Sequence, residues 1–252
     1  MDQNFATALL LAAGAGLSTT IGSLLGLMVQ KPGPRFTGFA LGFSAGVMIM
    51  VSFVELLRHS INSIGFLSAV SVFLLGMTSI FLIDFLVPHE YIGQHDHGKG
   101  RPRLMRIGIL IALGIGIHNF PEGMATFVGA LGDVRIGIAI ATAIAIHNIP
   151  EGLAVSAPIY AATGSRGKAF LWSFLSGVSE PLGAAITALV LFPFLTDTVL
   201  HWILALVAGI MVSISLDELI PAAKSFGSEH TPIIGVISGM FVMSFSLWIL
   251  NR

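Results

Sequence analysis

The sequence contains no cysteine, and few of its residues carry a charge. Without cysteine the chain forms neither disulfide bonds nor thiolate metal sites, and its redox compartment cannot be read. Charged residues make up 10% of the 252 residues, whereas a soluble domain carries about 25%. Hydrophobic residues make up 55%, and the mean hydropathy is +0.91. These values predict an integral membrane protein.

Three further absences narrow the class of protein. The sequence has no basic segment and no nucleic-acid-binding motif, which excludes nucleic acid as a partner. It has no series of alternating segments of about ten residues, which excludes a transmembrane β-barrel. No Lys or Arg precedes the first apolar run, and that run is too long for the core of a signal peptide. We therefore expect the first apolar run to be a transmembrane helix.

Long apolar segments dominate what is present. A helix of about 17–25 apolar residues can cross the roughly 30 Å of hydrocarbon in a bilayer. The sequence predicts an all-α integral membrane protein, an eight-helix bundle that forms a single transmembrane domain over residues 1–252. The expected spans are 5–29, 37–57, 65–86, 104–129, 134–160, 167–193, 199–220 and 231–250. Short connections with turn-forming residues join most of them.

Basic residues are distributed unevenly between the two sides of these spans. Nine of the twelve Lys and Arg residues fall near the connections that follow spans one, three, five and seven. Cytoplasmic loops carry an excess of Lys and Arg. We therefore expect the protein to lie in the inner or plasma membrane of the cell. The odd-numbered loops are expected on the cytoplasmic side, and both termini outside.

The connection at 88–103, "PHEYIGQHDHGKGRPR", is the only long one and is polar. It contains His89, His95 and His97. One interpretation is a solvated cytoplasmic linker. The other is a weak metal-capturing loop, because imidazole and carboxylate groups suit divalent metals.

Acidic residues occur inside the expected spans, whereas no Lys or Arg lies clearly within one. Charged groups at membrane depth are costly and usually functional. Buried acids without buried bases require protons or metal cations to balance them, so the asymmetry indicates a cation path. The acids are Glu55, Asp84, Glu122, Glu151, Glu180, Asp217 and Glu218.

One polar motif occurs twice, as "HNFPEG" at 118–123 and "HNIPEG" at 147–152. On a helix, residues i and i+4 lie about 40° apart and residues i and i+3 about 60° apart on the other side. Glu122 therefore lies one turn from both His118 and Asn119. One carboxylate could share its two oxygens between two metal ions, one on the His side and one on the Asn side.

The second copy has the same spacing, with Glu151 one turn from His147 and Asn148. Each copy also contains a proline, which removes a backbone N–H and frees a carbonyl, an arrangement tolerated at membrane depth where it lines protein or a cavity. Consecutive antiparallel spans can bring the two copies together near the midplane, where transporters place their sites. A lone buried His is often a hydrogen-bond partner between helices, but a repeated motif favours a metal site.

The segments "LGIGIHNFPEG", "TAIAIHNIPEGLAV", "SGVSEPLG" and "SLDELIP" resemble the ZIP family of divalent metal transporters, in particular its bacterial zinc-uptake branch. The resemblance covers nearly the whole chain. It implies that the eight-helix bundle is an inverted pseudo-symmetric repeat, with outer triplets around the fourth and fifth spans (3+2+3). It also implies a binuclear metal site between those two spans and a transporter that is not an enzyme.

The resemblance further implies which residues bind metal. The first position would use His118, Glu122, His147 and Glu151, and the second would use Asn119, Glu122, Asn148, Glu151 and Glu180. Met48 matches a position that can add a thioether to the first, and core packing is an equally good interpretation of it. For Glu180 the alternative is a carboxyl paired with a neighbouring helix.

A transport path follows from the same resemblance. Glu55 would lie towards the outer mouth, and Asp217 and Glu218 near the cytoplasmic end of the seventh span. The alternative for all three is a solvated helix end. His, Asn and Glu ligands without cysteine suit Zn²⁺ first and also Fe²⁺, Mn²⁺, Co²⁺ and Cd²⁺ as substrates. No prosthetic group is expected.

Other classes explain the motif less well. A membrane-embedded di-metal enzyme would also use a carboxylate-bridged bundle, but the sequence has no substrate-sized polar domain. An intramembrane metalloprotease would carry His-Glu-x-x-His, which does not occur. A proton or sodium channel would not need the twin His-Asn pairs. The sequence leaves open whether one ion is a structural metal and whether two chains form a homodimer.

Overall fold

The structure is a computed structural model, and it describes residues 2–28, 33–86, 100–132, 134–191, 194, 196–226 and 229–250. Nearly all of these residues are helical, and none of them lies in a β-strand. The prediction of an all-α bundle is therefore confirmed. The loop histidines His89, His95 and His97 lie outside the described residues.

The helices follow the expected spans closely, and some are joined end to end through π-helical turns. The elements are α1 (Asp2–Met28), α2 (Pro34–Val51), η1 (Ser52–Leu57), α3 (Arg58–Ile64), α4 (Phe66–Leu86), α5 (Gly100–Gly132), α6 (Val134–Thr163), α7 (Arg166–Ile186), η2 (Thr187–Leu191), α8 (Asp197–Ile214), η4 (Ser215–Leu219), α9 (Ile220–Lys224) and α10 (Thr231–Leu250).

Among the described residues, five helices are long and apolar enough to cross a membrane. They are Asn4–Met28, Pro34–Ile64, Arg166–Val190, Asp197–Lys224 and Thr231–Ile249. A shorter apolar helix covers Phe66–Leu82. Helices α5 and α6, which carry the twin motif, have 33 and 30 residues. A multi-pass membrane bundle is thus established, while the count of eight spans stays a prediction.

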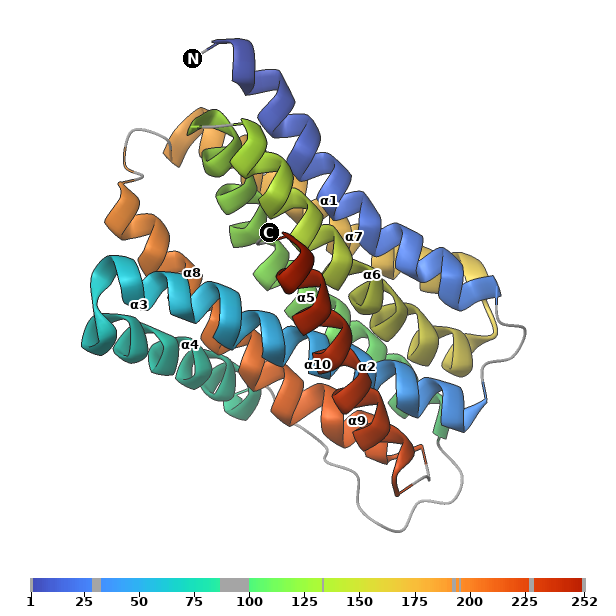
Figure 1. Cartoon of the computed structure of the whole chain (residues 1–252). Helices are drawn as coiled ribbons and strands as arrows, with labels where there is room; N and C mark the ends of the chain where they lie inside the picture. Colours follow the sequence, from blue (N-terminus) through green and yellow to red (C-terminus); the bar gives the residue numbers. More distant parts are fainter. Residues whose placement is uncertain are drawn as a thin grey trace.

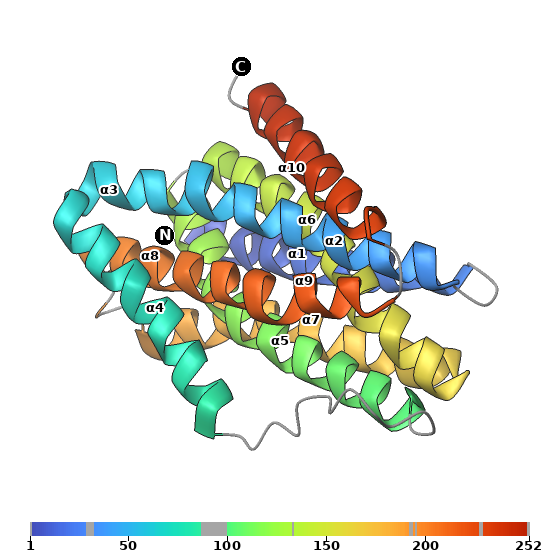
Figure 2. The same cartoon turned by 90° about the horizontal axis from the view of Figure 1, so that it is seen from below.

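Four helices surround the centre of the bundle. Helices α5 and α6 pack on each other, α1 packs on α6, and α7 packs on α5 and α1. Outside this group, α2 pairs with α10 and α4 pairs with α8 (Figure 2). Helices α1 and α7 run in opposite directions, and so do α2 and the α8–α9 rod (Figure 1).

Close contacts at glycine residues show that the outer helices repeat with an internal two-fold relation. A Cβ atom on Gly46 of α2 would overlap the carbonyl oxygen of Val236 on α10. A Cβ atom on Gly209 of α8 would overlap the carbonyl oxygen of Phe73 on α4. Gly46 and Gly209 are separated by the same number of residues as Phe73 and Val236. The first three helical rods and the last three therefore form an inverted repeat, as many transporters do.

The same relation extends to the π-helical turns. The segment "AGVMIMVSFVELL" at 45–57 aligns with "AGIMVSISLDELI" at 208–220. The hydroxyl of Ser52 donates to the carbonyl of Met48 at 2.7 Å, and the hydroxyl of Ser215 donates to the carbonyl of Met211 at 2.7 Å. Isolated π-helical turns are frequent at functional sites.

The inner helices meet by equivalent contacts. A Cβ atom on Gly123 of α5 would overlap the carbonyl oxygen of Glu180 on α7, and one on Gly152 of α6 would overlap the carbonyl oxygen of Thr19 on α1. Small residues at such positions let membrane helices approach closely. The twin motif therefore ends, in each copy, on a glycine that brings a neighbouring helix against the site.

We expect Gly152→Ala to lower stability by about 1–3 kcal/mol, because the added methyl group must push α1 away from α6. The measurement is the thermal unfolding midpoint of the purified protein in detergent. Gly14→Ala on α1 is the matched control, because a Cβ atom there has nothing within 4 Å. Equal midpoints for the two variants would contradict this description of the packing.

Candidate metal centre

Helices α5 and α6 bring the two copies of the motif into one buried cluster. His118, Asn119 and Glu122 come from α5, and the second copy contributes the equivalent residues of α6. Their side chains are at most 2% exposed. Both helices continue through the prolines of the motif. The one-turn spacing predicted from sequence therefore holds in each copy.

Each histidine is bonded to the glutamate of the other copy. The Nε2 atom of His118 lies 3.0 Å from Oε1 of Glu151, and Nε2 of His147 lies 3.0 Å from Oε1 of Glu122. Within one copy, Nε2 of His118 lies 4.0 Å from Oε2 of Glu122. Hydrogen bonds to a buried carboxylate are strong, and an unpaired carboxylate there would be costly. The crossed pairs hold the two motifs face to face.

The asparagines direct their amide groups away from this pair. The Nδ2 atom of Asn148 donates to Oε2 of Glu180 at 2.7 Å and to the carbonyl of Ala15 at 3.0 Å. The Nδ2 atom of Asn119 donates to the carbonyl of Ser176 at 3.3 Å. These hydrogen bonds use the NH₂ groups of the two asparagines and leave their amide oxygens free of hydrogen bonds.

The structure brings Glu180 into the cluster from α7, where it is fully buried. Its bond to Asn148 agrees with the interpretation of a carboxyl paired with a neighbouring helix, and its role as a metal ligand stays a prediction.

Several buried oxygens in the cluster have no hydrogen-bond partner. They are Oδ1 of Asn119, Oε2 of Glu122, Oδ1 of Asn148, Oε2 of Glu151 and Oε1 of Glu180. Most buried polar atoms in proteins are hydrogen-bonded, and each exception calls for an explanation. Oxygens of amides and carboxylates are suitable ligands for divalent cations.

The imidazole groups are turned towards carboxylates in this arrangement. Among the described residues, no three His, Asp or Glu side chains are arranged to hold a metal ion together. A cation bound by His118 and Glu151 at once would replace the hydrogen bond between them. The cluster thus contains donors of the kinds that bind divalent cations, and in this arrangement they are bonded to one another.

Met48 is fully buried on α2 in the largest apolar cluster, which also contains Ile111 and Ile115 of α5 and Met211 of α8. This position agrees with the core-packing interpretation. Its thioether as a ligand stays a prediction.

The three path residues lie on the π-helical turns, apart from the central cluster. Glu55 in η1 has 27% side-chain exposure, and its Oε1 atom lies 3.7 Å from Nδ1 of His59. In η4, Asp217 is exposed and Glu218 is partly buried. Asp217 lines a cavity of about 400 Å³ between α4 and the α8–η4 rod. Their positions allow either a transport path or helix ends in contact with solvent.

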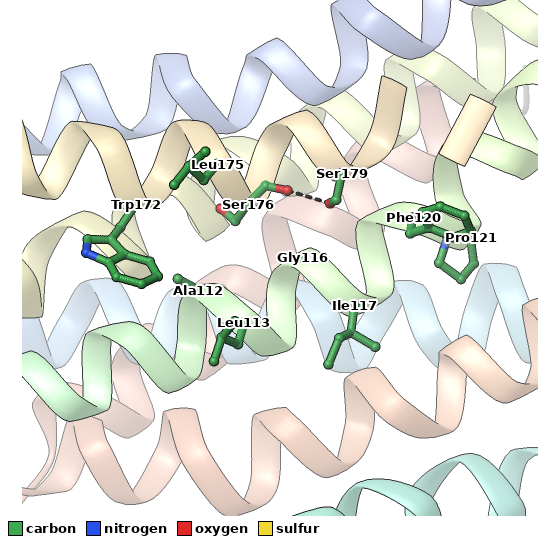
Figure 3. Close-up of a pocket in the computed structure, with 10 residues that line it drawn as sticks. All are labelled: Ala112, Leu113, Gly116, Ile117, Phe120, Pro121, Trp172, Leu175, Ser176 and Ser179. Carbon is green, nitrogen blue, oxygen red and sulfur yellow. Dashed lines mark hydrogen bonds between the residues drawn. The ribbon is translucent and has the colours of Figure 1, made fainter. Parts of the chain in front are cut away.

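A larger cavity of about 600 Å³ lies between α5 and α7 (Figure 3). Its lining is apolar except at Ser176 and Ser179. Their hydroxyl groups donate to backbone carbonyls at 2.8 Å and 2.6 Å, respectively. This cavity therefore offers few ligands to a cation, and it borders the first motif at Phe120 and Pro121.

The sequence prediction missed the contribution of α1. The carbonyl of Ala15 accepts from Asn148, and the carbonyl of Thr19 lies against Gly152 at the end of the second motif. A signal was present, because "GLSTTIG" at 16–22 aligns with "GVSEPLG" at 177–183.

Comparison with known proteins gives the class of this protein. The family model described as ZIP zinc transporter matches residues 88–247. The chain is 49% identical to the zinc transporter ZupT of Streptococcus mutans over 260 residues, which covers 98% of each chain. It is 50% identical to the zinc transporter ZupT of Nitratidesulfovibrio vulgaris, over 98% of each chain. It is 52% identical to the protein of that name from Chlorobium limicola, over 98% of this chain and 99% of the relative.

These matches define a multi-pass membrane protein of a transporter class, in agreement with the apolar helices. The chain belongs to the ZIP family of zinc transporters. Membership of a transporter family supports the prediction that it is not an enzyme.

The contact between α6 and α7 can be tested by cross-linking, because the chain has no cysteine of its own. We expect Asn148→Cys with Glu180→Cys to form a disulfide on oxidation, since these side chains are in contact. The measurement counts maleimide-reactive thiols before and after oxidation. Asn148→Cys with Leu182→Cys is the control, because Leu182 is 53% exposed on the outer face of α7. Equal loss of thiols in both would contradict the geometry.

Proposed function

We propose that this protein carries zinc across the cell membrane into the cytoplasm through the cluster between α5 and α6. The observation that carries the proposal is the crossed pairing of the two His-Asn-x-Pro-Glu-Gly motifs, which leaves one oxygen of each glutamate without a hydrogen bond. The names of the relatives support zinc as the substrate. Fe²⁺, Mn²⁺, Co²⁺ and Cd²⁺ are further substrates, because the ligand set is not strictly selective.

The proposed site is binuclear. The first position uses His118, Glu122, His147 and Glu151, with Met48 as an additional thioether donor. The second uses Asn119, Glu122, Asn148, Glu151 and Glu180. In each central glutamate Oε1 pairs with the histidine of the other copy, and Oε2 has no hydrogen-bond partner. This division of the two oxygens supports a bridging role.

Release requires that the ligands hold the ion only moderately. The crossed His–Glu hydrogen bonds can re-form when the ion leaves, so the charges of the cluster stay paired. Conduction and transport need sites that bind well enough to admit an ion and weakly enough to release it. Protons compete with the metal, because the ligands must be deprotonated to bind it.

In the proposed path, the ion passes Glu55 on the outer side and leaves past Asp217 and Glu218. The loop at 88–103 with His89, His95 and His97 receives it on the cytoplasmic side. The two-fold relation supports this order, because Glu55 and Glu218 are equivalent positions of an inverted repeat. Both termini then lie outside the cell.

Zinc-65 uptake by proteoliposomes tests the site. We expect Glu122→Ala and His147→Ala to reduce uptake more than about tenfold, since even groups that only orient ligands cost that much. Glu229→Ala, which removes an exposed acid, is the control. Uptake at the wild-type level in either site variant would rule out the site.

Orientation is tested with single cysteines. We expect a cysteine in place of His97 to react with an impermeant maleimide only from the cytoplasmic side, and one in place of Asp133 only from outside. Labelling of position 97 in intact cells would reverse the proposed topology.

A further inference from the structure

The wall of the metal centre is formed by two helices that are equivalent under the internal two-fold relation. Gly16 of α1 and Gly177 of α7 are in mutual contact, and a Cβ atom on either would lie 2.5 Å from the carbonyl oxygen of the other. One helical turn further along, Thr19 occupies on α1 the position that Glu180 occupies on α7.

Independent contacts confirm this register. Asn148 donates to the carbonyl of Ala15, and Asn119 donates to the carbonyl of Ser176. Ala15 and Ser176 differ by the same offset as Gly16 and Gly177. The two asparagines therefore use equivalent backbone positions of α1 and α7, although only one of those helices carries an acid there.

The oxygens without partners divide into two equivalent groups. On one side are Oε1 of Glu180, Oδ1 of Asn148 and Oε2 of Glu151. On the other side are Oγ1 of Thr19, Oδ1 of Asn119 and Oε2 of Glu122.

Thr19 is fully buried, and its Oγ1 atom lacks even the common hydrogen bond to the carbonyl one turn earlier. That bond is the usual way to satisfy a buried helical hydroxyl. Ser52 and Ser215 both make it. The hydroxyl of Thr19 is thus kept available.

We infer that the Thr19 hydroxyl is a further oxygen donor to the transported cation, on the Asn119 side of the centre. This inference rests on the proposed transport function. Threonine is shorter than glutamate and neutral, so it cannot reach Asn119 as Glu180 reaches Asn148. In the inferred arrangement a cation or its water lies between Thr19 and Asn119, and this side holds the ion less tightly than the Glu180 side.

The donor type predicts a change in metal preference. A hydroxyl oxygen is a hard ligand that favours Mn²⁺ over the softer Cd²⁺. Thr19→Val keeps the shape of the side chain and removes the hydroxyl, whereas Thr19→Ser keeps the hydroxyl and removes the methyl group. If Thr19 is a ligand, Thr19→Val should impair Mn²⁺ uptake more than Thr19→Ser. If Thr19 only fills space, Thr19→Ser should impair it more.

The experiment measures Mn²⁺ and Cd²⁺ uptake by proteoliposomes containing the full chain. We expect Thr19→Val to raise the KM for Mn²⁺ about tenfold, because the change removes roughly one good hydrogen bond or ligand contact. The KM for Cd²⁺ should change by less than about twofold. Thr19→Ser should resemble the wild type. Thr187→Val, which also removes a fully buried hydroxyl without a partner, should change neither metal.

Equal effects of Thr19→Val and Thr19→Ser, or equal effects on both metals, would overturn the inference. If Thr19→Val does not fold, Thr19→Asp decides: Mn²⁺ should raise its unfolding midpoint more than that of the wild type, and no larger rise would overturn the inference. Glu122→Ala is measured alongside. Undiminished uptake by Glu122→Ala refutes the proposed function itself, whereas its loss together with a normal Thr19→Val refutes only the role of Thr19.

Discussion

The burial of carboxylates with no Lys or Arg beside them is the constraint on which the rest of the described structure depends. Glu122 and Glu151 are almost wholly buried, and no Lys or Arg is buried among the residues that the structure describes. The protein meets this constraint by pairing each acid with the histidine of the other motif at 3.0 Å. Because each pairing uses one oxygen only, the cluster stays stable and still offers ligands.

Close packing between helices serves that arrangement. Each motif ends on a glycine that brings a carbonyl group of α7 or α1 against the centre. The four inner helices thereby pack closely around the crossed pairs, and the outer helices repeat the same kind of glycine contact. An inverted repeat puts two equivalent half-sites at one place, as is common in transporters whose sites lie near the midplane.

The two halves are nevertheless unequal at the position shared by Thr19 and Glu180. On one side the Glu180 carboxylate accepts from Nδ2 of Asn148 at 2.7 Å, whereas on the other side the equivalent position is held by the neutral Thr19, and Nδ2 of Asn119 donates to the carbonyl of Ser176. A symmetric centre would hold an ion equally on both sides. In the proposed centre this difference would give one tighter and one weaker side, which suits an ion that must leave again.

The helical elements and the residues of the twin motif could be predicted from the sequence, because hydropathy and one-turn spacing are local properties. The crossed pairing could not, since spacing fixes the face of each helix but not its rotation against a neighbour. The bond from Asn148 to Glu180 depends on the close approach of α6 and α7. Thr19 was missed because a single threonine in an apolar helix gives no local sign of a binding role, and its equivalence to Glu180 appears only when the two helices are aligned. The π-helical turns at Glu55 and Glu218 had no local signal either.

The central claim is that the crossed motifs form one binuclear cation centre bridged by their glutamates. The most direct measurement is the number of zinc ions bound per chain by purified protein in equilibrium dialysis, for the wild type and for Glu122→Ala. The account predicts binuclear binding in the wild type and the loss of tight binding in the variant, because one acid serves both positions. Unchanged stoichiometry and affinity in Glu122→Ala would contradict it.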